Sequence, residues 1–216
     1  YRTIEFAPGA AQGDGLLHVV RVDPKRALIQ IITQTQAGRR GGANPTAAEW
    51  REKTKMVAVI NAGMFATDHR THTGYLRVGE RINSGRWVDK YRSILLVGPS
   101  APDVPYFTIV DAEPGQSASA FADYTIVSQN LRLIRGPGRN AWAQSERRWS
   151  EAALALDESG RVLLLFSRSP LSMHDFNRRV LALPLKVTRA MHLEGGPEAS
   201  LSFSGAGVAR DLAGSY

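Results

Sequence analysis

The feature of this sequence that most constrains its fold is a series of short apolar runs, each ended by glycine, proline or polar residues. Residues 16–23, 107–111 and 124–129 are examples, and they are rich in valine, isoleucine and other strand-forming side chains. Runs of this length between turn residues are typical of β-strands. We predict further strands over residues 1–6, 27–32, 56–60, 74–78, 91–97, 152–156, 162–166 and 201–203, and one that leads to Glu194.

Two pairs of these runs have the pattern of hairpins. Residues 16–23 and 27–32 flank a proline turn, and residues 152–156 and 162–166 flank the turn Asp-Glu-Ser-Gly. We therefore expect each pair to form two antiparallel strands. Residues 56–60 are apolar throughout, which favours a buried strand.

N-terminal caps predict two helices. Thr46 and Glu49 have the spacing of a capping box, and the helix is expected to run to about Lys55. A basic, glycine-rich loop over residues 38–44 precedes it. Ser172 begins the second helix, in which apolar residues recur at helical intervals: Met173, Phe176, Val180 and Leu183.

The composition fits one folded domain. The chain has 216 residues, of which 43% are hydrophobic, and this is ample for a packed core. We predict a single α+β domain over residues 1–216, with mixed and antiparallel sheets, a few packed helices and a surface cavity. No apolar run approaches the ~18 residues that a membrane helix needs, so no membrane span is expected.

The compartment is predicted from the N-terminus. No signal peptide is visible, and the chain begins with Tyr1 instead of methionine. We therefore expect an export signal to have been removed and the protein to be periplasmic or secreted. The sequence contains no cysteine, which excludes disulfides and thiolate metal sites.

The net charge of +7 comes mostly from arginine, with 22 Arg and 5 Lys. Arginine forms bidentate hydrogen bonds with phosphate groups, so anionic ligands are conceivable. The arginines are scattered singly or in pairs and form no dense tract, and no zinc-finger or RNA-binding motif is present. We therefore do not expect nucleic acid to be the main partner.

Two stretches carry the chemistry, and each is a strand followed by a polar residue and a glycine turn. Glu194 is followed by Gly195 and Gly196, and glycine lets a ligand approach the main chain closely. Asn61 and Gly63 have the same arrangement after residues 56–60. Each stretch has a plainer interpretation, in which the acid is merely solvated and Asn61 caps a turn.

Other polar residues are candidates for ligand contacts. Arg168, beside Ser167, is the best candidate for a phosphate because a guanidinium matches its geometry, although a surface arginine is an equal alternative. Gln129 is a candidate for sugar hydroxyls, and strand alternation places His192 on the same face as Glu194. His69 and His72 with Asp68 are an alternative metal site or base. The two histidines lack a clear third ligand, so no metal site is predicted. The sequence requires no cofactor.

The motifs together resemble those of the phosphodiester glycosidase family. They are, in chain order, Asn61-Ala62-Gly63-Met64-Phe65 with Asp68, Gly74-Tyr75-Leu76, Gln129-Asn130, and Glu194-Gly195-Gly196 with Ser200. Their order and spacing match from about Leu16 to Phe203. The resemblance implies an α+β domain with a cavity, and hydrolysis of a sugar 1-phosphodiester with release of the sugar. It implies a carbohydrate or sugar-phosphate ligand, such as an N-acetylglucosamine 1-phosphodiester.

Carried over by position, the resemblance assigns Asn61, Gly63 and Ser200 to substrate binding, together with Gly195 and Gly196. Glycosidases ordinarily use two carboxylates. We expect Glu194 and Asp68 to be the catalytic pair, with Glu198 a third carboxylate in the substrate site.

The sequence departs from the family pattern at two places. Pro197 and Glu198 follow Gly196 where the family has glycine and serine, and proline removes an amide donor. An Arg-Thr pair often precedes the strand that here reads Glu151-Ala-Ala-Leu-Ala, and the nearest arginines are at 147–148. These departures suggest a bacterial subgroup with its own substrate, in the cell envelope or in exopolysaccharide. A non-catalytic carbohydrate or glycan-phosphate binding module is the alternative.

Overall fold

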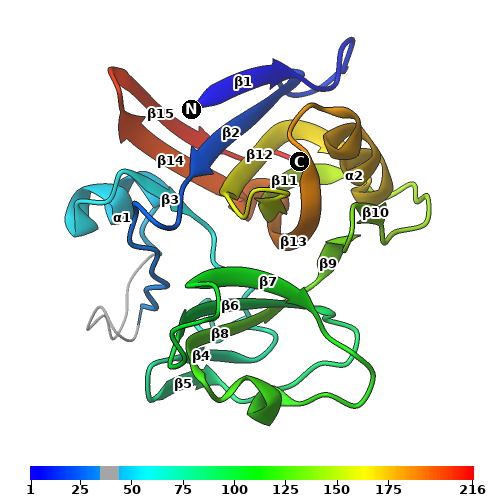
Figure 1. Cartoon of the computed structure of the whole chain (residues 1–216). Coiled ribbons are helices and arrows are strands. Elements are labelled where there is room, and N and C mark those ends of the chain that lie inside the picture. The colour runs from blue at the N-terminus through cyan, green and yellow to red at the C-terminus, as the bar shows by residue number, and fades with distance from the viewer. Residues whose placement is uncertain (35–43) are drawn as a thin grey trace.

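The computed structural model describes residues 1–34 and 44–216, so the predicted loop over residues 38–44 lies outside the described residues except for Asn44. Within them, three antiparallel sheets and two α-helices form the fold (Figure 1). The predicted α+β class is confirmed.

The largest sheet, the central sheet, has seven strands in the order β1-β2-β12-β11-β13-β9-β10. Their bounds are β1 (Arg2–Glu5), β2 (Leu16–Val22), β12 (Val162–Leu171), β11 (Trp149–Asp157), β13 (Val187–Gly195), β9 (Arg132–Arg135) and β10 (Arg139–Asn140).

Two smaller sheets complete the strands. The five-stranded sheet has the order β5 (Arg81–Ser84), β4 (Leu76–Val78), β8 (Tyr124–Asn130), β6 (Ser93–Pro99) and β7 (Phe107–Asp111). The three-stranded sheet has the order β15 (Val208–Ala213), β14 (Ser200–Gly205) and β3 (Ala58–Ile60). The helices are α1 (Ala47–Thr54), α2 (Met173–Ala182) and two short 3₁₀ turns, η1 (Ala118–Phe121) and η2 (Gly196–Glu198).

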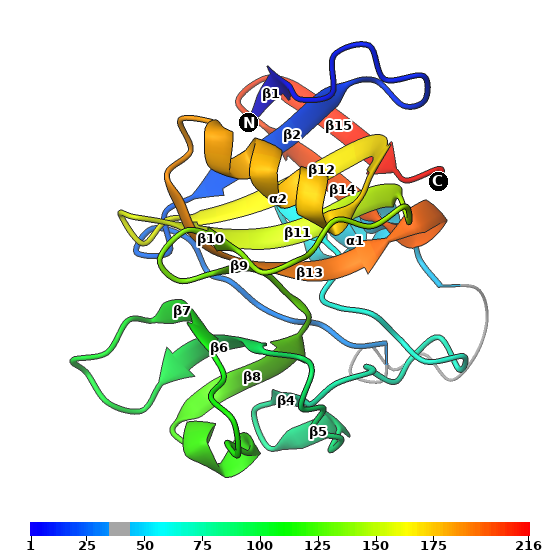
Figure 2. The ribbon, with the colours of Figure 1, turned by 90° about the vertical axis from the view of Figure 1, so that its right-hand side faces the viewer.

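Alternation along β11 explains how the layers stack, because successive side chains of a strand point to opposite faces. Ala153 and Ala155 belong to the core cluster that contains α2. Leu154 belongs to the cluster shared with the five-stranded sheet, and Ala152 to the one shared with the three-stranded sheet. The central sheet is therefore covered by α2 on one face and by the two smaller sheets on the other (Figure 2).

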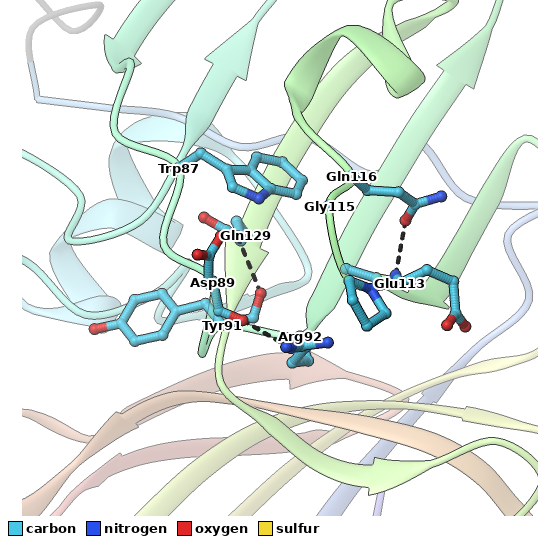
Figure 3. Close-up of a pocket in the computed structure, with 10 residues that line it drawn as sticks. Trp87, Asp89, Tyr91, Arg92, Glu113, Gly115, Gln116 and Gln129 are labelled. Atoms are coloured by element: carbon cyan, nitrogen blue, oxygen red, sulfur yellow. Dashed lines mark hydrogen bonds between the residues drawn. The ribbon is translucent and has the colours of Figure 1, made fainter.

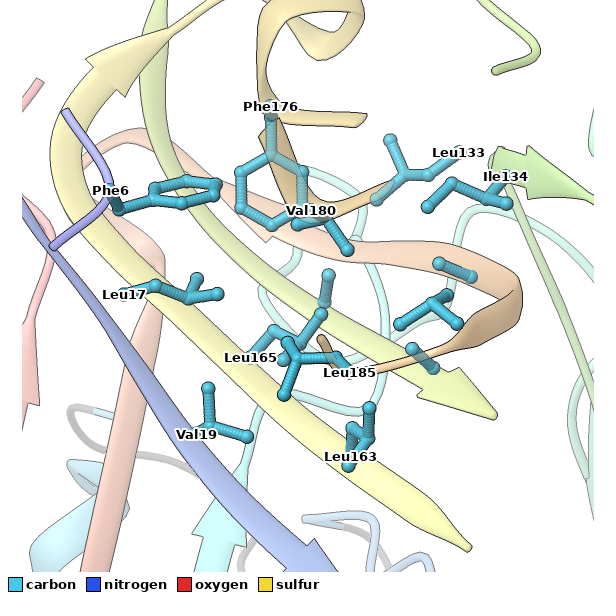
Figure 4. Packing of buried hydrophobic residues seen from close by; sticks show 14 of the residues in the cluster. Phe6, Leu17, Val19, Leu133, Ile134, Leu163, Leu165, Phe176, Val180 and Leu185 are labelled. Atoms are coloured by element: carbon cyan, nitrogen blue, oxygen red, sulfur yellow. The ribbon is translucent and has the colours of Figure 1, made fainter. Parts of the chain in front are cut away.

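The cluster beneath α2 is apolar and closely packed (Figure 4). Phe176 and Val180 of α2 are 1% and 0% exposed, and they lie over Leu163 and Leu165 of β12. Burying a side chain of this size stabilises the fold by roughly 1.5–3 kcal/mol. This packing holds α2 on the sheet in which β11 and β13 are neighbours.

The predicted caps are confirmed. The amide of Glu49 donates to the Thr46 hydroxyl at 3.2 Å, and the amide of Thr46 donates to the Glu49 carboxylate at 2.7 Å. Lys55, with a φ of 58°, is the C-terminal cap of α1. The amide of Asp175 donates to the Ser172 hydroxyl at 3.1 Å. The helices of the described residues are all too short or too polar to cross a membrane.

The predicted hairpin of residues 152–156 and 162–166 is confirmed as β11 and β12. The predicted hairpin of residues 16–23 and 27–32 is wrong. Residues 27–32 form no strand. Strand β2 pairs with β1 on one edge and with β12 on the other, so no edge is left for them. The buried strand predicted at 56–60 is also corrected. Strand β3 begins only at Ala58, lies at a sheet edge and is half-buried, since β14 is its one partner in the sheet. Strand β15, which was not predicted, follows the predicted strand over residues 201–203.

Candidate functional site

The turn after β13 brings the predicted acid motif against the start of β11. Gly196 has a φ of 70°, which favours glycine, and η2 begins there. A Cβ atom on Gly195 would lie 2.6 Å from Cδ1 of Trp149 and 3.3 Å from Cε1 of His192. Only glycine leaves room for the Trp149 indole at this point, so the two adjacent glycines have distinct physical reasons.

A buried pair of opposite charges lies beside this turn. Nδ1 of His192 and Oε1 of Glu151 are 2.6 Å apart, and their side chains are 4% and 2% exposed. The Trp149 indole donates to the other carboxylate oxygen at 2.9 Å. Burial works against a charged imidazole, but the Glu151 carboxylate outweighs it and raises the pKa of His192. The pair therefore favours a protonated His192 held by Glu151.

Glu194 is half-buried, and the charges of this pair act on it. A β-bulge in β13 makes Ala152 the register partner of Glu194 and Ala153 that of His192. The two side chains therefore lie on opposite faces of the sheet, and the predicted common face is wrong.

Burial is the main reason that the pKa of Glu194 is raised, and repulsion from the carboxylates of Glu198 and Glu151 adds to it. The backbone amide of Gly195 donates to Glu194 at 3.0 Å, and this amide and His192 partly offset the rise. The raised pKa makes Glu194 a stronger base than an ordinary glutamate.

Asn61 joins the two predicted motifs. Its side-chain oxygen accepts from the Ser200 amide at 2.7 Å and from the Ser200 hydroxyl at 3.2 Å. Its side-chain nitrogen donates to the carbonyl of Glu198 at 3.0 Å. These bonds hold the end of β3 against the turn between β13 and β14. The acid turn and the Asn61 motif, which are far apart in the sequence, thus form one surface.

Gly63 lies against two buried polar side chains. Its φ is 143°, and a Cβ atom there would lie 2.3 Å from Cε1 of His72 and 2.5 Å from Oδ1 of Asn130. Nε2 of His72 is 2.7 Å from the carbonyl of Gln129. Burial lowers the pKa of His72, so this ring is neutral. Close packing thus requires glycine at position 63.

Gln129 is fully buried, and backbone groups occupy its amide. The amides of Tyr75 and Val88 donate to its oxygen, and its nitrogen donates to the carbonyls of Val88 and Tyr91. These four bonds use the full hydrogen-bonding capacity of the amide. Gln129 therefore shapes the surface around it, and its predicted contact with sugar hydroxyls stays a prediction.

Asp68 organises its own loop. It accepts from the amides of Arg70 and Thr71 at 2.9 Å each, and from the Thr71 hydroxyl at 2.5 Å. The Thr71 hydroxyl and these amides lower the pKa of Asp68 to about 2. The carboxylates that act on Glu194 are those of Glu198 and Glu151. Asp68 is not among them, and its predicted catalytic role stays a prediction.

Ser167 and Arg168 lie within β12, and not at its end. Ser167 is the register partner of Glu151 and is fully buried. Its neighbour Arg168 points to the opposite face, because strand side chains alternate. Nε of Arg168 donates to the carbonyl of Ala213 at 3.1 Å. The next residue, Gly214, donates its amide to Ala199 in the acid turn, so Arg168 borders that turn through residues 213–214.

Glu151 and Trp149 were not among the sequence-predicted site residues. One signal could have found Glu151, namely a charged residue at the start of a run of five apolar residues in a predicted strand. Buried charges of this kind are paired in folded proteins, and His192 is the partner. In the residues that the structure describes, no cluster of three or more histidine, aspartate or glutamate side chains could hold a metal ion.

A comparison with known proteins identifies the family of the chain. A sequence profile of the phosphodiester glycosidase family matches residues 54–215, which include both motifs. The chain belongs to the phosphodiester glycosidase family. No curated protein matches the chain.

Two solved structures are similar in fold. One is the zebrafish N-acetylglucosamine-1-phosphodiester alpha-N-acetylglucosaminidase catalytic domain, auto-inhibited by its pro-peptide, with a TM-score of 0.55 and 15% identity. The match covers 74% of this chain and 58% of that one. The other is a hypothetical protein from Synechocystis, with a TM-score of 0.51, 14% identity, and coverage of 99% and 55%. The family member described here thus spans less than two thirds of either structure.

Proposed function

We propose that this protein hydrolyses a glycosyl 1-phosphodiester and releases the sugar. The observation that carries the proposal is the turn joined to Asn61, where Glu194 is half-buried and within electrostatic reach of the buried Glu151–His192 pair. It supplies a carboxylate of raised pKa, a fixed positive charge and a glycine-lined surface. Membership of the phosphodiester glycosidase family supports the same reaction class.

In the proposed reaction, Glu194 acts as the base. A water oxygen attacks the anomeric carbon, the bond from that carbon to the phosphate oxygen breaks, and Glu194 accepts the proton of the water. The products are the free sugar and a phosphate monoester. Phosphate is a good leaving group, so the raised basicity of Glu194 is more useful than acid assistance. Arg168 is proposed to contact the phosphate, and Glu198 and Ser200 the sugar hydroxyls.

The test is turnover of a panel of sugar 1-phosphodiesters, measured as reducing sugar released. Glu194→Gln should lower kcat/KM by roughly 10²–10⁴-fold, because it removes the base while it keeps the size of the side chain. Glu158→Gln is the matched control. Glu158 lies in the exposed β11–β12 turn, where its carboxylate pairs with Lys186. Unchanged turnover in a folded Glu194→Gln variant would remove Glu194 from the mechanism.

A second candidate is a non-catalytic module that binds a carbohydrate or glycan phosphate. The observation that favours it is the excess of carboxylates, since Glu198 and Glu151 both repel the charge of Glu194 and only one imidazole, His192, offsets them. Such a site repels an anionic diester more than a neutral glycan. Saturable binding of the same panel, measured by calorimetry, with no release of sugar from any member, would favour this second function.

We further propose that the substrate is a bacterial envelope glycan or exopolysaccharide, and that the protein acts in the periplasm or outside the cell. Glycans of this kind lie in those compartments. Fractionation of cells that produce the full-length protein tests the proposal, and recovery in the cytoplasm alone would contradict it.

A further inference from the structure

A second concave site lies on the five-stranded sheet and is built by other elements than the Glu194 site. It has a volume of about 150 Å³, well above the roughly 10–15 Å³ that one water molecule requires. The connection between β5 and β6 forms one side, and the connection between β7 and η1 forms the other (Figure 3). The residues that matter are Trp87, Asp89, Arg92, Glu113, Gln116 and Gln129.

The first side is held in place by several contacts. The Trp87 ring stacks on Phe121, with 6.1 Å between centroids and 20° between planes. The buried Gln129 amide bonds to the backbone of Val88 and Tyr91, on either side of Asp89. Nε of Arg92 donates to the carbonyl of Asp89 at 2.7 Å. A site whose walls are fixed before binding loses less entropy when a ligand arrives.

The second side supplies polar groups opposite the indole. The backbone amide of Glu113 donates to Oε1 of Gln116 at 2.9 Å, which fixes the turn between them. The Glu113 and Asp89 carboxylates are exposed, and Trp87 is half-exposed. The opening is therefore lined by one half-buried indole, two acidic residues and one arginine.

This combination matches a neutral sugar ring. A pyranose has an apolar face, which can lie on an indole, and a rim of hydroxyls that both donate and accept. Carboxylates accept from such hydroxyls, and a guanidinium donates to them, through charge-assisted hydrogen bonds. Two carboxylates against one guanidinium disfavour an anionic ligand, so a phosphate or a uronic acid fits less well.

We propose that this pocket is an accessory binding site for a neutral pyranose residue of a glycan. The proposal goes beyond the hydrolysis proposed above and does not depend on it. Glu194, Glu151 and His192 do not line the pocket. The two hypotheses therefore fail separately.

The experiment is saturation-transfer NMR, with calorimetry, using glucose, galactose, N-acetylglucosamine and glucuronate as probes. We expect at least one neutral sugar to bind in the millimolar range. Trp87→Ala should abolish binding, and Trp50→Ala is the matched control, because Trp50 lies on α1. Asp89→Asn, a change at an exposed side chain, should weaken binding about tenfold without loss of folding.

Glu194→Gln should bind the neutral sugar as the unaltered protein does, whatever it does to turnover. Binding that is lost in Glu194→Gln but kept in folded Trp87→Ala and Asp89→Asn would overturn the proposal, since it would place the sugar in the Glu194 site. Failure of all three neutral sugars to bind would also overturn it. So would tighter binding of glucuronate than of any neutral sugar.

Discussion

Glu151 and His192 are 41 positions apart in the chain, yet their side chains form one buried charged unit. Taking two charges out of water is costly unless they are paired and hydrogen-bonded, and Trp149 supplies the additional donor. Removing one member of a buried pair leaves the other without compensation, at a cost of about 3–5 kcal/mol. The protonation of His192 is therefore tied to Glu151.

Glu151→Gln tests this dependence. Because the variant keeps a similar shape but loses the charge, the pKa of His192 should fall below its value in the unaltered protein, as measured by NMR titration of the imidazole. The same titration in Glu158→Gln should be unchanged.

Stability should follow the same pKa. The folded pKa of His192 is raised above that of an unfolded histidine, about 6.5. Its contribution to stability is therefore fully present below pH 6.5 and is lost as the pH rises through the folded value. Urea unfolding should show this loss in the unaltered protein and a smaller one in Glu151→Gln. An equal loss in both would contradict the assignment.

The pH dependence of turnover tests the role of Glu194. A base must be deprotonated, so kcat/KM should rise with pH through the pKa of Glu194, which lies above that of an ordinary glutamate. In Glu198→Gln the repulsion from Glu198 is absent, so this acidic limb should move to lower pH. A limb that stays in place in this variant would show that another group controls it.

At the scale of elements, the turn between β13 and β14 depends on two close approaches. Gly195 leaves room for the Trp149 indole, and Asn61 links β3 to the turn through Ser200 and Glu198. Elements from three separate parts of the chain therefore meet at one turn, and β11 supplies Glu151 to the same place.

Gly195→Ala should destabilise the protein by about 1–3 kcal/mol, because the added methyl group would overlap the indole of Trp149. Gly85→Ala is the matched control, since the nearest atom to a Cβ there is 3.9 Å away and its φ is not in the glycine region. We expect the control to stay within about 0.5 kcal/mol. Chemical denaturation measures both, and equal effects of the two substitutions would argue against the close approach.

The same elements show how far sequence reasoning reached. The caps at Thr46 and Ser172 and the β11–β12 hairpin were predictable, because each depends on residues a few positions apart. The hairpin with residues 27–32 was not, because β12, from much later in the chain, takes the edge of β2 that this hairpin needs. Competition for strand edges is invisible in a local pattern.

For the whole molecule, acidic side chains link residues that are far apart in the chain. Asp157 ends β11 and accepts from Nε of Arg21 on β2 at 3.0 Å. Burial opposes its ionisation, but the Arg21 bond and the amides of Arg161 and Ser159 lower the pKa of Asp157. Asp175 lies in the first turn of α2, and hydrogen bonds from Gln144 and Ser172 lower its pKa as well.

Acid should therefore destabilise the protein by protonating Asp157, Asp175 and Asp68, whose pKa values are all lowered. Their folded pKa values lie below the ordinary value of 3.8, so their stabilisation is present above pH 3.8 and is lost as the pH falls through the folded values, which for Asp68 is about 2. The free energy of unfolding in urea should fall as the pH is lowered from about 5 to about 2, a range that includes the ordinary pKa of aspartate. Asp157→Asn should lose about 1.5–3 kcal/mol at pH 5 and depend less on pH below it. An unchanged slope in this variant would exclude Asp157 as a contributor.

The sequence by itself determined the α+β class, the helix caps, most of the strands and the two motifs of the candidate site. Each of these follows from side-chain periodicity or from contacts between near neighbours. Only the tertiary structure decided that Glu151 is the partner of His192, that Asn61 holds the Glu194 turn, and that Asp68 serves its own loop. The reason is physical: strand order and register join residues 41 and 139 positions apart, and burial then selects which charges must pair.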